Sequence, residues 1–354
     1  MTRTQQLVSI STKNVDLGDS MIETCEVKLS EISKITGHDK SIISKYFKNL
    51  PEGMVTRVNN RIVGVSPEGA NDYLVNTGLA HFNRGAVILL ANICGGVGKT
   101  TGTHNIAAGL RRLTSRNDPI VIIDGDPQAS LTKHIFKEVP PNNTLLLIDF
   151  LEGRATIDDI LIQLNNNIWF LKSNLNQSFI ERVLSKPQEI KNGMLRFYQS
   201  IFDKLGNKTK IIQDHNPSLN IVLASSICAI HQLESSILTT LMVPMRGDDY
   251  AITGAQNTLR ELKSLKETYS FTTSINLQCY FSSMDSRIST MASVLNKANE
   301  DKELVKHLSS VGIRFSDDVH KSINERRNVY TKNPSNKAVE DYNELVNNIF
   351  GYHT

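Results

Sequence analysis

The hydrophobic pattern divides the chain into short apolar runs and longer segments of helical character. Runs at 87–91, 120–123 and 276–281 are rich in apolar residues and have the length of buried strands. Segments between them, including 104–113 and 178–205, have helical patterns. Strands that alternate with helices predict an α/β fold with a doubly wound, mostly parallel sheet that helices cover on both faces.

The N-terminal part of the chain has a different pattern. Residues 1–25 are polar and aperiodic, which predicts an N-terminal arm. From 29 to 47, apolar residues recur at spacings of three and four on either side of a turn, so two short helices are expected. Asp39 is the predicted N-cap of the second helix. Asn59-Asn60 then separates two β-branched runs, as in a β-hairpin.

A helix, a turn with glycine, a second helix and a hairpin together predict a winged helix-turn-helix DNA-binding domain at 26–80, followed by a linker at 81–86. Basic and acidic residues nearly balance in this part of the chain, so a small helical cap or a dimerisation domain stays an alternative. The candidate DNA-binding residues are Lys40, Ser41, Ser44, Lys45 and Lys48 on the second helix, and Arg57 and Arg61 near the hairpin tip.

Composition narrows the class of protein. The 354 residues are 40% hydrophobic and 21% charged, which fits a globular protein with one large and one small domain. A net charge of +3 permits contact with nucleic acid without requiring it. The four cysteines lack CxxC spacing, which argues against a zinc knuckle or a disulfide framework. No apolar stretch approaches the roughly 20 residues of a membrane span, and the N-terminus lacks the apolar core of a signal peptide. We therefore expect a cytoplasmic protein.

The apolar run at 87–91 leads into a glycine-rich loop that ends in Lys-Thr-Thr and is followed by a helical pattern. A strand, such a loop and a helix in this order are typical of a phosphate-binding site. Backbone N–H groups of the loop surround the β-phosphate, the lysine reaches the β and γ oxygens, and a threonine hydroxyl binds Mg²⁺. The predicted nucleotide-binding residues are Gly95, Gly96, Val97, Gly98, Lys99, Thr100 and Thr101, with Thr100 also a magnesium ligand.

Three carboxylates follow predicted strands. Asp124 and Asp126 end the run that begins at 120, and Asp214 ends a short apolar run that begins after Lys208. Open α/β sheets bind ligands at the carboxyl ends of their strands. Asp214 is therefore expected to hold Mg²⁺ through water. A strand-end turn with two solvated acids is the alternative for the first pair.

The loop GGVGKTT and the segment DGDPQ resemble two motifs of the ParA/MinD family of partitioning and positioning ATPases. The deviant Walker A motif of that family reads KGGVGKTT, and its second motif reads DxDPQ. The general P-loop pattern GxxxxGK[ST] does not fit, because Ile93 stands where its first glycine would be. The resemblance implies ATP and Mg²⁺ as cofactors. It also implies that Lys99 and Asp126 are catalytic, with Asp126 orienting the attacking water and Asp124 supporting that water or the metal shell.

Three later segments extend the resemblance over roughly 87–350. One reads DHNPS where the family has DTPPS, and 239–254 resembles the next strand and loop of the family. The segment 282–290 resembles the family's MYDSRT region. Asp285 and Arg287 are therefore expected near the nucleotide or the dimer face, with a solvated loop as the alternative.

The resemblance also implies a function for the ATPase domain at 87–354. ATP would promote a homodimer that binds DNA nonspecifically, and a ParB-like centromere-binding protein would stimulate an otherwise slow hydrolysis. This predicts a nucleoid-associated ATPase that drives plasmid, phage or chromosome segregation. The segment 318–330 resembles an exposed basic segment of the family, with an ordinary solvated face as the alternative. Its candidate DNA-binding residues are Lys321, Arg326 and Arg327.

Cys94 departs from the family at a position that matters for the mechanism. The family has a lysine there, which crosses the dimer interface to the partner's nucleotide, whereas a thiol carries no positive charge at neutral pH. Arg246 is the candidate for a replacement cation. Weaker dimerisation, or a thiol that only fills a small space, would explain the cysteine equally well.

The last helical pattern, 338–354, carries acidic residues on its polar face, whereas a membrane-targeting helix carries Lys and Arg there. We therefore expect a core-packing helix and no membrane partner. Two further functions stay open beside partition. One is a positioning ATPase for a different cargo, and the second is a transcriptional repressor that uses the nucleotide only as a switch.

Overall fold

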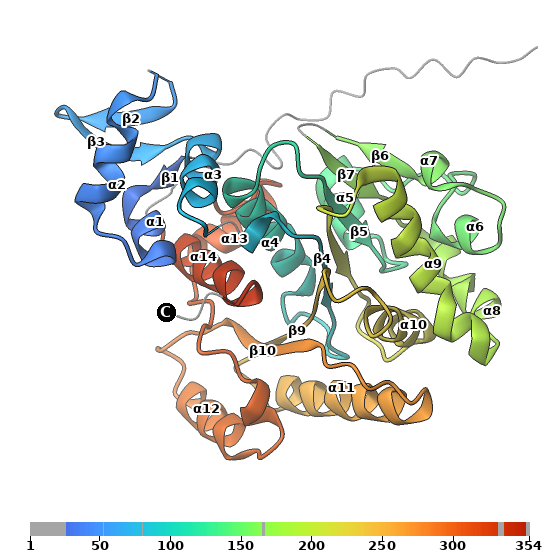
Figure 1. Ribbon diagram of the computed structural model, residues 1–354. Coiled ribbons are helices and arrows are strands. Elements are labelled where there is room, and N and C mark those ends of the chain that lie inside the picture. The colour runs from blue at the N-terminus through green and yellow to red at the C-terminus, as the bar shows by residue number, and fades with distance from the viewer. Residues whose placement is uncertain (1–25, 52, 80, 165–166, 332–335, 352–354) are drawn as a thin grey trace, which may run out of the picture.

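A seven-stranded sheet forms the centre of the computed structural model, which describes residues 26–51, 53–79, 81–164, 167–331 and 336–351 (Figure 1). The expected arm at 1–25 lies outside the described residues. The strand order is β10-β9-β4-β8-β5-β7-β6, and all neighbours pair in parallel except β6 with β7. The mostly parallel sheet is thereby confirmed. The strands are β4 (Ala86–Leu90), β5 (Ile120–Asp124), β6 (Leu161–Gln163), β7 (Ile168–Leu171), β8 (Lys210–Asp214), β9 (Leu238–Arg246) and β10 (Asn276–Ser283).

Helices cover both faces of this sheet, and each face has its own core. Because side chains alternate along a strand, Val87 and Leu89 of β4 join one core while Ile88 and Leu90 join the second. The first core packs against α6, α7, α9, α10, α11 and α12, and the second packs against α4, α5, α14 and the N-terminal elements. The helices are α4 (Lys99–Leu113), α5 (Ser130–Phe136), α6 (Leu147–Leu151), α7 (Ile157–Ile160), α8 (Ile180–Val183), α9 (Pro187–Leu205), α10 (Ile221–Ile230), α11 (Asp249–Thr268), α12 (Thr290–Glu300), α13 (Asp317–Asn324) and α14 (Lys337–Ile349).

The N-terminal unit consists of a three-stranded antiparallel sheet in the order β1-β3-β2 and three helices. The Asp39 side chain accepts a hydrogen bond from the Ser41 N–H and caps the second helix, as predicted. Asn59 and Asn60 both have positive φ, which suits a tight hairpin turn between β2 and β3. The elements are β1 (Val27–Lys28), α1 (Leu29–Thr36), α2 (Lys40–Tyr46), β2 (Val55–Val58), β3 (Arg61–Val65) and α3 (Pro67–Asn76).

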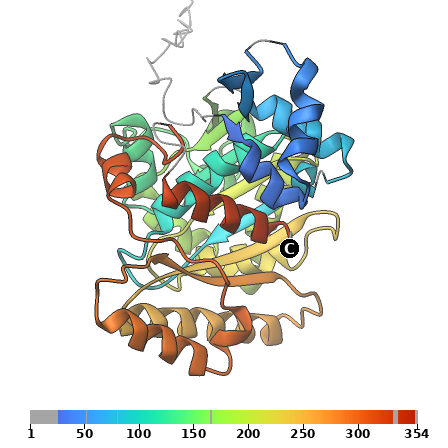
Figure 2. The same cartoon turned by 90° about the vertical axis from the view of Figure 1, so that its left-hand side faces the viewer.

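The N-terminal unit lies directly against α14 and α4, which Figure 2 shows from the side. Its buried residues belong to the same continuous core as one face of the central sheet. The short 3₁₀ turn His81–Asn83 falls in the segment expected as a linker, and the buried Phe82 ring packs against Phe350 with 5.3 Å between the ring centroids. The two parts of the chain therefore share a hydrophobic core.

Arg112, near the end of α4, is the polar centre of that contact. Its side chain is fully buried, and its guanidinium donates to the Glu31 carboxylate of α1 at 2.8 Å and to the Asn343 amide oxygen of α14 at 2.9 Å. The Glu26 carbonyl accepts a further hydrogen bond at 2.7 Å, and the Tyr330 ring lies 4.7 Å from the guanidinium carbon. One arginine thus joins the N-terminal unit, α4 and α14.

Replacement of Arg112 by methionine should lower the free energy of unfolding by about 3–5 kcal/mol, because it leaves the largely buried Glu31 carboxylate without its cation. Urea unfolding of the full chain measures this loss. The matched control is Arg116→Met, which removes an exposed ion pair with Glu68 and should cost about 0–1 kcal/mol. Equal midpoints for the two variants would contradict a central role for Arg112.

Candidate nucleotide site

The glycine-rich loop connects β4 to α4 at the carboxyl edge of the sheet. Gly96 and Gly98 have φ values of +69° and +86°, a left-handed conformation that favours glycine. No atom outside the neighbouring residues lies within 4 Å of the position that a Cβ at Gly95 would take. The loop thus presents backbone to open space at the start of a 15-residue helix, as a phosphate cradle requires.

Lys99 lies across the inner side of this loop. Its ammonium donates to the carbonyls of Asn92 at 3.0 Å and Cys94 at 2.8 Å, and the side chain is only 7% exposed. Burial lowers the pKa of Lys99, while the nearby Asp214 and Asp126 carboxylates oppose that shift. The loop therefore holds one buried cation where a bound phosphate would need it.

Thr100 and Asp214 meet beside the loop. The Thr100 hydroxyl donates to one Asp214 carboxylate oxygen at 2.6 Å, and the second oxygen is buried without a hydrogen-bond partner among the described residues. Burial, with a smaller contribution from the Asp124 carboxylate, raises the pKa of Asp214 well above its usual range.

The donor set at Thr100 and Asp214 fits a magnesium ion. A hydroxyl next to a carboxylate oxygen without a partner offers the hard oxygen ligands that Mg²⁺ prefers. The described part of the chain contains no cluster of three His, Cys, Asp or Glu side chains that could hold a metal. Nucleotide oxygens and water would therefore have to complete the coordination of Mg²⁺.

The two acids of the DGDPQ segment have different environments. Both oxygens of the buried Asp124 carboxylate accept hydrogen bonds, one from the Thr132 N–H and hydroxyl at 2.7 and 2.6 Å, and the second from the Asp126 N–H at 3.1 Å. Burial raises the pKa of Asp124 to about 6. Asp126 is half-buried, and its carboxylate accepts from the Gln128 N–H at 2.8 Å. Asp124 therefore fixes the turn, and Asp126 is the more accessible of the two acids.

Asn92 is a site residue that the sequence motifs did not indicate. Its side chain is buried, donates to the Pro244 carbonyl at 2.9 Å and accepts from the Cys94 N–H at 2.9 Å. It thereby joins the start of the loop to the end of β9. A polar residue directly after a buried strand was the available signal in the sequence.

The Cys94 thiol faces the first turn of α11. Its sulfur lies 3.0 Å from the Tyr250 carbonyl, and a Cβ at Gly254 would come within 2.9 Å of it. This packing agrees with a thiol that fills a small space between the loop and α11.

A cation lies at the loop although Cys94 carries none. Arg246, at the end of β9, places its guanidinium next to Gly96: a Cβ added at Gly96 would lie 3.4 Å from one guanidinium nitrogen. Arg246 is 54% exposed and pairs with Asp248 at 2.8 Å. At the end of β10, Ser282 lies next to Gly98.

The Asp285 and Arg287 side chains follow β10. The guanidinium of Arg287 donates twice to Asp285, at 2.9 and 2.7 Å, and this hydrogen bonding lowers the pKa of Asp285 to about 2. The guanidinium carbon also lies 4.9 Å from the Phe315 ring centroid. Arg287 is therefore engaged by Asp285 and by the Phe315 ring.

The residues predicted to bind DNA lie on α2, on the β2–β3 hairpin, and on α13 with the segment that follows it. Lys40, Ser41 and Lys45 are exposed on α2, Ser44 is half-buried there, and Arg61 is exposed next to the hairpin turn. Lys321 is exposed on α13.

The prediction of an exposed basic segment near the C-terminus was wrong for one residue. The Arg327 side chain is 8% exposed and pairs with Glu325 at 2.6 Å. Its guanidinium is therefore not available to DNA in this structure. The neighbouring Arg326 is half-buried with a φ of +53°.

Comparison with protein families places this site in a known group. Residues 85–279, more than half of the chain, match a family model described as an AAA domain. The chain belongs to this AAA-domain family. The match includes the glycine-rich loop, the two acids of the DGDPQ segment, Asp214 and α11, whereas Ser282, Asp285 and Arg287 lie beyond its end.

Two relatives share part of this chain. Over 191 residues the chain is 26% identical to an uncharacterized protein of Methanocaldococcus jannaschii. The alignment covers 51% of this chain and 67% of that protein. Over 147 residues it is 29% identical to an uncharacterized protein of Mycobacterium tuberculosis. That alignment covers 40% of this chain and 43% of the mycobacterial protein. The chain thus spans less than half of the mycobacterial relative.

Solved structures share the fold at low sequence identity. McdA of Cyanothece has a TM-score of 0.61 at 20% identity, covering 75% of this chain and 99% of McdA. A protein of Borrelia burgdorferi described as a plasmid partition protein, bound to AMPPNP, has a TM-score of 0.57 at 19% identity, with 75% and 98% covered. Cobyrinic acid a,c-diamide synthase of Mycobacterium smegmatis, with an ATP analogue and magnesium, has a TM-score of 0.58 at 20% identity, with 74% and 92% covered. One fold therefore serves different activities.

Replacement of Gly254 by alanine should destabilise the protein. A Cβ there would lie 2.3 Å from the Asn92 amide oxygen, and such overpacking costs about 1–3 kcal/mol, more than the gain of up to about 1 kcal/mol in helix propensity. Urea unfolding should show the net loss. Thr253→Ala, an exposed change one residue earlier on the same helix, should stay within about 0.5 kcal/mol of wild type. A Gly254→Ala variant more stable than wild type would contradict the packing described for Asn92.

Proposed function

We propose that the chain is a ParA-type partition ATPase that binds ATP and Mg²⁺ and hydrolyses ATP to ADP and phosphate. The observation that carries this proposal is the buried Lys99 ammonium inside a GGVGKTT loop, next to the Thr100 and Asp214 pair. The neighbours of the same fold that were solved with AMPPNP, or with an ATP analogue and magnesium, support the choice of cofactors.

The residues have distinct roles in this proposal. Backbone N–H groups of Gly95–Thr101 bind the phosphates, and Lys99 neutralises charge on the β and γ oxygens. Thr100 and Asp214 hold Mg²⁺, which when bound draws the phosphate oxygens into position and offsets their charge. Asp126 orients the attacking water, and Asp124 positions Asp126 through the hydrogen bond from its N–H.

Dimerisation and DNA binding complete the proposal. ATP promotes a homodimer, a ParB-like centromere-binding protein stimulates hydrolysis, and DNA segregation follows from the resulting cycle of DNA binding and release. The winged helix-turn-helix domain at 26–80 binds a specific DNA site through Lys40, Lys45 and Arg61. Lys321 and Arg326 contact DNA without sequence preference. The protein acts in the cytoplasm, at the nucleoid, without a membrane partner. Among the described residues, no helix is long and apolar enough to cross a bilayer.

A nucleotide-switched transcriptional repressor is the second candidate function. The burial of Arg327 and the uncharged side chain at Cys94 favour it, because both reduce the positive charge available for nonspecific DNA binding and for a trans contact to phosphate. Specific DNA binding without measurable ATP turnover would favour this candidate over partition.

Replacement of Lys99 by alanine should reduce ATP hydrolysis by about 10²–10³-fold, because it removes the buried cation that faces the developing phosphate charge. Phosphate release under saturating ATP and magnesium measures the rate. Lys133→Ala changes an exposed lysine on the nearby α5 and should leave the rate unchanged. Wild-type turnover by the Lys99 variant would reject the site.

Replacement of Arg246 by alanine should weaken the ATP-dependent dimer by about ten- to a hundredfold. A hydrogen bond to a charged group contributes about 1.5–3 kcal/mol, and Arg246 is the exposed cation at Gly96. Sedimentation with a non-hydrolysable ATP analogue measures the dimer, with Arg196→Ala on the surface of α9 as control.

Cys94→Lys distinguishes two origins of the dimer contact. A lysine at 94 should strengthen the dimer if the family's trans contact can be restored. No gain from this variant, together with the expected loss from Arg246→Ala, would show that Arg246 supplies the contact. An unchanged dimer in both variants would rule out a cation at either position.

The variants Lys45→Ala and Arg61→Ala of the full chain should each weaken binding to a duplex selected by the wild-type chain from a random pool. Each lost phosphate contact should also lower the slope of log affinity against log salt by about one. Fluorescence anisotropy over a range of salt concentrations measures both effects. Lys34→Ala, on α1, is the control. Unchanged affinity and slope in both test variants would argue against the winged-helix assignment.

A further inference from the structure

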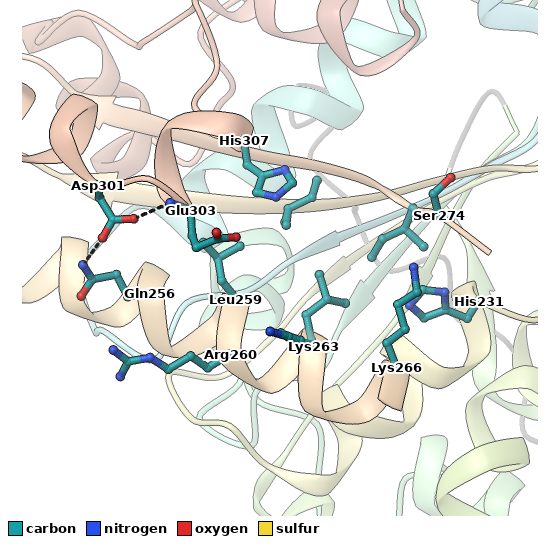
Figure 3. A pocket seen from close by; sticks show the side chains of 13 residues that line it. His231, Gln256, Leu259, Arg260, Lys263, Lys266, Ser274, Asp301, Glu303 and His307 are labelled. Atoms are coloured by element: carbon teal, nitrogen blue, oxygen red, sulfur yellow. Dashed lines mark hydrogen bonds between the residues drawn. The ribbon is translucent and has the colours of Figure 1, made fainter. Parts of the chain in front are cut away.

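A groove of about 510 Å³ runs along the second half of α11, at the far end of this helix from the phosphate loop (Figure 3). One wall is α11, and the opposite wall is formed by the start of β10 and the 3₁₀ turn Leu304–His307. Its floor is apolar, with Leu259 and Leu262 from α11 and Ile275 and Leu277 from the β10 side. These leucines of α11 are only half-buried, so apolar surface stays open to solvent.

The α11 wall carries three cations. Arg260, Lys263 and Lys266 line the groove at helical spacings of three, and none forms an ion pair with a described residue. Arg260 only donates a hydrogen bond to Asn257, at 3.1 Å. The long side chains can place their methylene groups on the apolar floor while their charges stay in water.

The opposite wall carries two acids, but these are already engaged. Asp301 accepts from the Gln256 amide at 2.6 Å and from the Leu304 N–H at 2.7 Å, which Figure 3 shows in part. Glu303 pairs with Lys306 at 2.7 Å. The Arg260 and Lys263 charges act on Asp301 and Glu303 only at longer range, so the α11 wall carries three cations without a direct ion pair to a described residue.

We propose that this groove binds an acidic amphipathic helix of a partner protein. The apolar stripe of such a helix would cover Leu259, Leu262 and Ile275, and Asp or Glu residues along one edge would meet Lys263 and Lys266. An α-helix rises 1.5 Å per residue, so the wall from Gln256 to Lys266 has the length of about ten helical residues of a partner.

DNA fits this groove less well than a helix. A phosphate backbone gains nothing from an apolar floor, whereas an amphipathic helix can place its apolar stripe on that floor and turn its acidic edge towards the α11 wall, away from Asp301 and Glu303. Specific partner helices, in contrast, bind through apolar anchors flanked by complementary charge. The proposal concerns docking alone and is independent of the proposed ATPase activity.

Selection from a displayed peptide library tests the groove. The library consists of helical peptides of about 14 residues with a leucine stripe at spacings of three and four and with all remaining positions random. The full chain is the target, and the double variant Lys263→Glu/Lys266→Glu is used for counter-selection. Enriched peptides should carry Asp or Glu along one edge of the stripe.

Dissociation constants of the enriched peptides then locate the contact. The double charge reversal should weaken binding by about tenfold or more, and Leu259→Gln should do so as well. Lys302→Glu reverses an exposed charge beside the groove that does not line it, and should leave binding unchanged. ATP turnover should stay at the wild-type level in all these variants, which separates this test from that of the site.

Three outcomes would overturn the proposal. Enriched peptides that are basic, or that bind the double variant as well as wild type, would exclude an acidic helix. A random-sequence duplex that competes with the peptides and loses affinity on Lys263→Glu would assign the groove to nucleic acid. Dodecanoate that saturates the groove where no peptide is enriched would assign it to a small amphipathic anion.

Discussion

The fully buried charge of Arg112 is the constraint on which the arrangement of the whole chain depends. A buried guanidinium is tolerated only when its N–H donors find hydrogen-bond acceptors. Here the acceptors are the Glu31 carboxylate, the Asn343 side-chain amide oxygen and the Glu26 carbonyl. The same helix begins at Lys99 in the phosphate loop. A single helix therefore places the nucleotide site at one end and the contact with the N-terminal unit at the opposite end.

Three acids near one another at the sheet edge differ in their tasks because their hydrogen bonds differ. Asp124 has every oxygen satisfied by its own chain and acts as a fixed part of the turn. Asp214 has one oxygen held by Thr100 and one that lacks a described partner, so it is prepared for an additional ligand. Asp126 is the most accessible. The different roles of the three acids follow from how deeply each carboxylate is buried and how many hydrogen bonds it accepts. A sequence motif alone reports neither property.

The sheet and the loop were predictable from local pattern, because apolar runs of strand length and glycines at positive φ are properties of short segments. Asp39 as a helix cap was predictable for the same reason. The burial of Arg327 was not predictable, because a basic run looks alike in the sequence whether it is exposed or buried. The role of Asn92 likewise requires β9 and α11, which lie about 150 residues later, beside the loop.

The packing of α11 against the loop has a thermodynamic consequence for the groove. The first turn of this 20-residue helix touches Asn92 and Cys94, and its second half forms the groove wall. If an occupant of the groove favours one position of α11, nucleotide affinity must change by some factor, and by linkage nucleotide must change the occupant's affinity by the same factor. In that case the coupling factor measured at one site equals the factor at the second, and α11 is the element that would carry it.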